Sequence, residues 1–127
     1  KRGLAGKFHF PGIMRGKQVQ EMLAMSDVYI MPSVSEPFGI SPLEAMQVGC
    51  PSIISHQSGC AEILQHAIKT DYWDIDAMAD AIYAIVKYPA MYKSLHELGM
   101  AEVNNIKWAD AGLKVRRIYD GVINHTL

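Results

Sequence analysis

Two carboxylates eight positions apart, Glu36 and Glu44, flank the stretch of this chain whose residue types are best suited to binding a ligand. Gly39, which lies between them, permits dihedrals that other residues resist and lets a ligand approach the backbone closely. Ser41, Pro42 and Glu44 predict a helix start, with the serine as N-cap, the proline at the first helical position and the glutamate completing a capping box. Free N–H groups at such an end favour an anion. The arrangement suits a ligand with a central diphosphate and hydroxyls at both ends, which is the shape of a nucleotide sugar.

Strands and helices that alternate along the chain would position this stretch. Strands are expected at Phe8–Phe10, Val28–Met31, Ser52–Ser55 and within Ile68–Asp74, and helices at Lys17–Met25, Pro42–Val48, Ala61–His66, from Asp76 (as N-cap) to Pro89, at Ala90–Val103 and at Ala109–Ile123. The alternation predicts a Rossmann-like α/β fold, a parallel sheet with flanking helices. Ligands of such sheets bind outside the carboxyl ends of the strands, where the loops Pro32–Ile40 and His56–Cys60 are expected.

The order of the motifs resembles one enzyme family. The two glutamates have the E-x7-E spacing within Glu36-Pro37-Phe38-Gly39, Leu43-Glu44-Ala45-Met46 and Gly49-x-Pro51. Downstream, Ser58-Gly59-Cys60-Ala61-Glu62 resembles a G-G-x-x-E loop, and upstream Phe8-His9-Phe10-Pro11-Gly12 resembles a V-x-F-x-G strand. The set is similar to the glycosyltransferase group 1 (GT4-like) family of retaining GT-B enzymes over about residues 7 to 125. The segment Lys69–Asp74 departs from the family pattern, which usually has a Gly-rich turn at this place.

The resemblance implies a role for each residue of the central stretch. Glu36 is the implied catalytic residue, whose carboxylate would accept hydrogen bonds from hydroxyls of the donor sugar. Glu44 would accept both ribose hydroxyls of the nucleotide, although a purely structural capping role competes for the same oxygens. Further contacts to sugar and phosphate would come, mainly through backbone N–H groups, from Pro37, Phe38, Gly39, Ile40 and Leu43. The Phe38 side chain is expected in the core, and His56 with Ser58-Gly59 is evenly balanced between lining the pocket and a structural role.

The chemistry implied by the resemblance is transfer of a sugar from a nucleotide-diphosphate sugar to an acceptor hydroxyl, with retention at the anomeric carbon. The acceptor would be a glycan, a polysaccharide or a lipid-linked molecule. No cofactor and no metal are expected, because backbone dipoles and basic side chains would offset the diphosphate charge. This transfer chemistry differs from the two-carboxylate scheme of glycosidases, so Glu36 and Glu44 are not interpreted as such an acid/base pair.

Length and composition place the chain among folded globular proteins. Its 127 residues are 50% apolar and 20% charged, and a net charge of −1 gives no reason to invoke nucleic acid. No apolar run approaches the roughly 20 residues that span a bilayer. Two cysteines without metal or redox spacing and the lack of a secretory signal predict a cytoplasmic location, with association at a membrane surface left open.

The resemblance also predicts a longer protein. A GT-B enzyme has two Rossmann-like domains and needs roughly three times this length. Residues 1–127 are therefore expected to be the C-terminal donor-binding domain, truncated at its N-terminal side, with the helix at 109–123 packing towards an N-terminal domain. Two alternatives stay open: a non-catalytic regulatory or assembly module derived from a glycosyltransferase, and a related GT-B enzyme such as a phosphorylase or epimerase. The sequence does not specify the base, the sugar, the acceptor or the oligomeric state.

Overall fold

A three-stranded parallel sheet forms the centre of the computed structural model, which describes residues 3–124. Its strands are β1 (Tyr29–Met31), β2 (Ser52–Ser55) and β3 (Ile68–Thr70), in the order β1-β2-β3. Ile30 lies opposite Ile53 in one pair, and Ile54 lies opposite Lys69 in the other. Every residue of β2 is buried, as expected for a central strand covered on both faces. The parallel sheet confirms the predicted α/β class.

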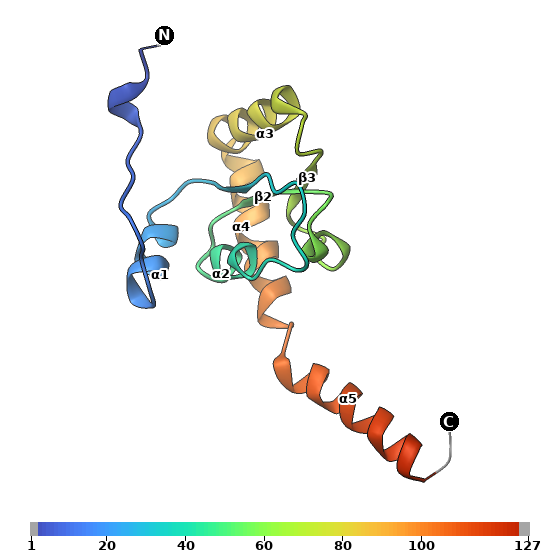
Figure 1. The fold of residues 1–127 in the computed structure, drawn as a ribbon. Coiled ribbons are helices and arrows are strands. Elements are labelled where there is room, and N and C mark those ends of the chain that lie inside the picture. Colours follow the sequence, from blue (N-terminus) through green and yellow to red (C-terminus); the bar gives the residue numbers. More distant parts are fainter. Residues whose placement is uncertain (1–2, 125–127) are drawn as a thin grey trace.

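Helices lie around this sheet, and the last of them extends away from it (Figure 1). They are α1 (Lys17–Ala24), α2 (Ser41–Gln47), α3 (Ile75–Lys87), α4 (Pro89–Asn104) and α5 (Trp108–Ile123), with the 3-10 turns η1 (Ala5–Lys7) and η2 (Gly59–Glu62). α2 packs against β1, β2, α1 and α4, whereas α3 packs against β2, β3 and α4. The predicted α-helix at Ala61–His66 is wrong, because this segment holds only the end of η2 and an irregular stretch.

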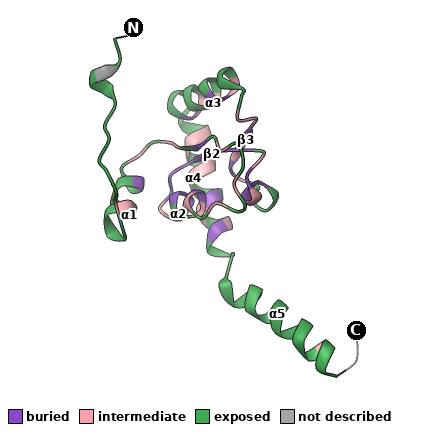
Figure 2. Ribbon diagram, viewed as in Figure 1, coloured by how far each residue is buried: buried purple, intermediate pink, exposed green. Residues whose placement is uncertain are grey.

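The hydrophobic core lies where α2, α4 and the sheet meet. Met46 of α2, Ile54 of β2 and Val103 of α4 belong to one buried cluster, together with Leu64 from the segment before β3. Figure 2 shows buried stretches of the ribbon around α2, β2 and the adjoining part of α4. Gly49 ends α2 with φ +84° and donates its N–H to the Met46 carbonyl at 3.0 Å, which confirms the predicted helix end.

The strand predicted at Phe8–Phe10 is wrong. These residues lie outside regular structure in an extended segment that leads away from the sheet (Figure 1), and the Phe10 side chain is 91% exposed. An apolar run forms a strand only when a neighbouring strand takes its backbone N–H and C=O groups. Within the described residues, none pairs with it.

Two predicted helix caps are also wrong. Ser41 is the first residue of α2 rather than its cap, so Pro42 takes the second position and the capping box with Glu44 does not form. The Ser41 hydroxyl instead accepts a hydrogen bond from the Tyr29 hydroxyl at 2.7 Å. In α3 the cap is Asp74 rather than Asp76, and the Asp74 carboxylate accepts the Ala77 N–H at 2.9 Å.

α5 extends away from the rest of the fold (Figures 1 and 2). None of its residues is buried, although its sequence is amphipathic. Its exposed apolar side chains are Trp108, Leu113, Val115, Ile118, Tyr119, Val122 and Ile123. The chain therefore forms the predicted helix without covering its apolar face. Among the described residues, no helix has both the length and the apolar character needed to cross a membrane.

Candidate functional site

Two loops meet at the carboxyl ends of β1 and β2, as the sequence predicts. The Gly59 N–H donates to the Glu36 carbonyl at 2.9 Å, and the Cys60 N–H donates to the Phe38 carbonyl at 2.7 Å. One link lies nearer the sheet, where the Ser55 hydroxyl donates to the Ser33 carbonyl at 2.6 Å. The Glu36–Phe38 backbone is thus fixed to η2 by backbone hydrogen bonds.

Gly59 is required at this junction for space. A Cβ at that position would run into the Pro37 carbonyl oxygen and press on the Cα of Phe38. Gly39 is required for its conformation, since its φ is +87° and the side chains of Met31 and Glu36 crowd the position of a Cβ. Both glycines therefore let the loop lie close to its neighbours.

A cavity of about 500 Å³ opens beside this loop, which is within the size range of small-molecule sites. One wall is formed by the loop and α2, and the other by the end of α4 and the start of α5. The lining residues are Phe38, Ile40, Leu43, Glu44, Gln47, Val103, Ile106, Lys107, Trp108 and Ala111. The wall is mainly apolar and carries one carboxylate and one ammonium group.

The Glu44 carboxylate is available for a ligand. Glu44 is exposed on α2, and within the described residues its side chain has neither a hydrogen bond nor an ion pair. The capping alternative is removed, because the Glu44 N–H bonds to the Ile40 carbonyl and the carboxylate makes no bond to Ser41. A carboxylate can accept about four hydrogen bonds, so Glu44 has the capacity to hold two adjacent hydroxyls.

Glu36 lies beside the cavity rather than in its wall. Its residue is half-buried, and one carboxylate oxygen accepts the Phe38 N–H at the long distance of 3.4 Å. No cation pairs with it in the described part of the chain. A carboxylate with one weak internal partner keeps most of its acceptor sites for other donors.

The backbone N–H groups of the loop divide into two sets. Those of Leu43 and Glu44 both bond to the Ile40 carbonyl, at 2.9 and 3.1 Å, so these two amides already have a partner within the chain. Those of Gly39 and Ile40 find no acceptor within residues 3–124. An exposed amide without a partner can bind an anion or a hydroxyl oxygen.

The predicted site residues thus fall into two groups by position. Phe38, Ile40, Leu43 and Glu44 line the cavity, whereas Glu36, Pro37 and Gly39 form the loop beside it. The expectation that the Phe38 side chain lies in the core is wrong, because this side chain is exposed and faces the cavity. Which of these residues contact a ligand stays a prediction.

Sequence reasoning missed the second wall of the cavity, which comes from Val103, Ile106, Lys107, Trp108 and Ala111, and also missed Gln47 of α2. The residues of this second wall come from α4, from α5 and from the turn between them, some 60 positions after the first wall, and none of the site motifs includes them. Trp108, which is 83% exposed at the start of an amphipathic helix, is the one signal that could have drawn attention to this junction.

His56, Ser58 and Gly59, for which the sequence leaves a pocket role and a structural role equally open, do not line the cavity. Ser58 is buried and shares a hydrogen bond with the Ser55 hydroxyl at 2.9 Å, while the His56 N–H donates to the Thr70 carbonyl. Both contacts are structural. Within the described ranges, no three His, Cys, Asp or Glu side chains are grouped so that they could hold a metal ion.

Known proteins are similar to this chain in sequence and in fold. An uncharacterized glycosyltransferase of Methanocaldococcus jannaschii is 39% identical over 52% of this chain and 17% of its own. The 2-deoxystreptamine N-acetyl-D-glucosaminyltransferase of Niallia circulans is 32% identical over 79% of this chain and 26% of its own. The structure of sucrose-phosphate synthase from Thermosynechococcus elongatus matches 83% of this chain with a TM-score of 0.69 and 27% identity, and the match spans 27% of that protein. The chain spans about a quarter or less of the length of these curated relatives.

The family model described as glycosyl transferases group 1 matches residues 1–101, which contain both glutamates, the joined loops and α2. The structural match extends the agreement to a Rossmann-like α/β arrangement. The chain belongs to the group 1 glycosyltransferase family.

Proposed function

We propose that this chain supplies the donor-binding surface of a retaining GT-B glycosyltransferase. The donor is a nucleotide-diphosphate sugar, and the acceptor is a hydroxyl of a glycan, a polysaccharide or a lipid-linked molecule. The observation that carries the proposal is the placement of two carboxylates without cationic partners, Glu36 and Glu44, on either side of a loop whose Gly39 and Ile40 amides are unpaired within the described chain. Acceptors for hydroxyls and donors for an anion lie together there.

Each group then has a chemical task. Glu44 accepts the two ribose hydroxyls, and Glu36 accepts hydroxyls of the sugar being transferred. The Gly39 and Ile40 amides face the negative charge that grows on the leaving diphosphate, where fixed donors need no reorganisation during the reaction. The leaving oxygen takes the proton of the incoming hydroxyl, so Glu36 positions the sugar and does not act as a glycosidase nucleophile. No metal ion enters this scheme.

The rest of the active site comes from a second domain in this proposal. The uncovered apolar face of α5, including Trp108 and Ile118, is the surface on which that N-terminal domain packs. The acceptor site lies in the second domain. The 127-residue chain by itself is then expected to bind the donor without transferring sugar.

Isothermal titration calorimetry with UDP, ADP and GDP tests donor binding and identifies the base. One nucleotide should bind, and EDTA should leave its affinity unchanged. Glu44→Gln should weaken binding by about tenfold to a hundredfold, because a hydrogen bond to a charged group contributes about 1.5–3 kcal/mol. The control is Glu97→Gln, an exposed position on α4 whose carboxylate pairs with Lys93 at 3.8 Å, and this variant should bind as the unmodified chain does. Equal affinities for both variants would contradict the assignment of Glu44.

A further inference from the structure

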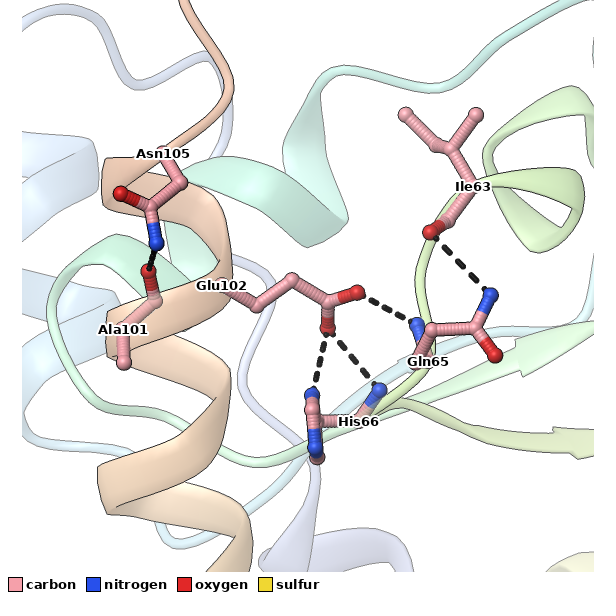
Figure 3. A network of polar contacts seen from close by, with 6 residues as sticks. All are labelled: Ile63, Gln65, His66, Ala101, Glu102 and Asn105. Atoms are coloured by element: carbon pink, nitrogen blue, oxygen red, sulfur yellow. Dashed lines mark hydrogen bonds and ion pairs between the residues drawn. The ribbon is translucent and has the colours of Figure 1, made fainter.

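The Glu102 carboxylate on α4 holds the segment before β3 through three hydrogen bonds (Figure 3). One oxygen accepts the Gln65 N–H at 2.6 Å. The other accepts the His66 N–H at 2.9 Å and lies 3.1 Å from the His66 ring Nδ1. The Glu102 side chain is only 13% exposed, so these groups replace most of its water. Such a set is costly to break, because a buried carboxylate without partners carries a large desolvation penalty.

The same segment is tied at its other end to the predicted donor loop. We call residues 59–66 the connecting segment. The Cys60 N–H donates to the Phe38 carbonyl at 2.7 Å, and the Leu64 N–H donates to the Cys60 carbonyl at 3.0 Å. Gln65 follows directly, with its N–H on Glu102. These hydrogen bonds, together with the peptide bond between Leu64 and Gln65, therefore connect Phe38 to Glu102 on α4.

These two ends belong to the two walls of the cavity. Phe38 lines the first wall, and Val103, the residue after Glu102, lines the second. α4 ends at Asn104, the residue after Val103, and Ile106, Lys107 and Trp108 continue the second wall. The position of this junction relative to Phe38 sets the width of the cavity.

We infer that Glu102 is a positioning residue for the donor site, which fixes the α4–α5 junction against the Phe38 loop through the connecting segment. The inference rests on the proposed function for the identity of the ligand, but its geometric part stands without it. Glu102 touches no ligand. It keeps the second wall in one place, so that most molecules hold the cavity in the arrangement that binds the ligand.

The first test needs no ligand and uses amide and indole NMR shifts of the whole chain. Glu102→Gln replaces one of the two accepting oxygens by an NH2 group, so the Gln65 and His66 N–H groups can no longer both be accepted. The NMR signals of Gln65 and His66 should therefore shift, together with those of Phe38, Cys60 and the junction at residues 103–108. His66→Ala removes only the ring contact and should give the same pattern at smaller size, which keeps the test decisive if Glu102→Gln does not fold. Glu97→Gln, the same chemical change on an exposed face of α4, should leave these signals in place.

Shifts confined to residues 63–66 and Glu102 itself would overturn the inference, since Glu102 would then stabilise only its own surroundings. The second test is nucleotide affinity. Glu102→Gln should raise Kd by about threefold to tenfold, because the apparent affinity falls with the fraction of molecules in the competent arrangement. Ile85→Val is the control for lost stability, because Ile85 is buried on α3 and belongs to neither wall.

The two controls separate the possible failures. If Ile85→Val raises Kd as much as Glu102→Gln does, the effect is one of stability and the positioning role is refuted. If the unmodified chain binds no nucleotide, the proposed function fails, while the ligand-free shifts still decide whether Glu102 joins the two walls.

Discussion

At the scale of single residues, Gly59 holds together the two loops on which the site depends. Its N–H bonds to the Glu36 carbonyl, and its missing side chain lets Pro37 pass close by. Any residue except proline has such an N–H, but only glycine leaves room for the Pro37 carbonyl. The sequence motif around Gly59 predicts a small-residue loop, but only the structure gives the partner against which the loop packs.

Gly59→Ala should therefore destabilise the fold by about 1–3 kcal/mol, because the added methyl meets backbone atoms that cannot rotate away. Gly112→Ala on α5 is the matched control. A Cβ there meets nothing within 4 Å, and alanine should favour the helix by roughly 0.5–1 kcal/mol. Urea unfolding of both variants checks the difference, and a Gly59→Ala chain as stable as the unmodified one would show that the loops are not in this contact.

The two free cysteines are predicted to be unreactive in the folded chain. Burial, together with the nearby charge of Asp27, raises the pKa of the Cys50 thiol to about 11, although a backbone hydrogen bond at Tyr29 opposes the rise. Burial also raises the pKa of the Cys60 thiol. Since the thiolate is the reactive form, modification by a disulfide reagent at pH 8 should be slow until guanidinium unfolds the chain. Rapid modification of either thiol in the native state would contradict the burial of both residues.

At the scale of elements, the start of α3 shows how a helix boundary is decided. Both Asp74 and Asp76 are chemically suited to cap it, and the sequence favours the second. The structure places Asp74 at the cap because the chain turns at Asp71, whose carbonyl accepts the Asp74 N–H at 3.0 Å. Asp76 then lies in the first turn.

Asp74→Ala should lower the free energy of unfolding by about 1 kcal/mol, the usual effect of losing an N-cap side chain. Asp76→Ala should cost less, because Asp76 makes no capping bond and interacts only with the helix dipole, an effect of about 0.3–1 kcal/mol. Thermal or urea denaturation of the two variants compares them directly. The reverse order would mean that α3 begins at the later position.

The contact between α4 and the segment before β3 should make stability depend on pH. Burial alone would raise the pKa of Glu102, but hydrogen bonds from the Gln65 and His66 amides and the His66 ring outweigh it, so the pKa is lowered from its ordinary value. A carboxyl whose pKa is lower in the folded state contributes stability above its unfolded pKa, and this contribution is lost as pH falls through the folded pKa.

Acidification below the ordinary range of a glutamate should therefore destabilise the chain, and part of this loss should be absent in Glu102→Gln. Measuring the urea midpoint of both chains from pH 7 to pH 3 checks the sign. Glu97→Gln is the control, because this exposed carboxylate should leave the slope unchanged. Parallel pH profiles for all three chains would contradict the part assigned to Glu102.

At the scale of the whole molecule, much of the fold could be predicted because its signals are local. Apolar runs without alternation predict β1 and β2, and spacing of apolar residues predicts α1, α3, α4 and α5. Phe8–Phe10 carries the same kind of signal yet forms no strand, since strand formation depends on a partner that local sequence does not describe. The first wall of the cavity could be predicted from a motif. The second wall could not, because Lys107 and Trp108 reach it only through the packing of α4 on α2.

The apolar surface left on the molecule also belongs to this scale. α5 is helical but buries none of its residues, whereas α4 contributes Val103 to the core. The apolar face of α5 therefore contributes no buried residue to the fold of residues 3–124. This is the observation behind the proposal that a second domain covers α5, and it explains why donor binding and sugar transfer are expected to separate in this chain.

An amide NMR titration with the nucleotide selected by calorimetry tests the central claim most directly, because it locates the ligand. The account predicts shifts at residues 36–45, with the Gly39 and Ile40 amides among the largest, and much weaker shifts in Glu44→Gln at the same ligand concentration. Glu97→Gln should reproduce the unmodified pattern. Shifts that leave residues 36–45 unaffected, or that are equally strong in Glu44→Gln, would contradict the assignment of this loop and its two carboxylates as the donor site.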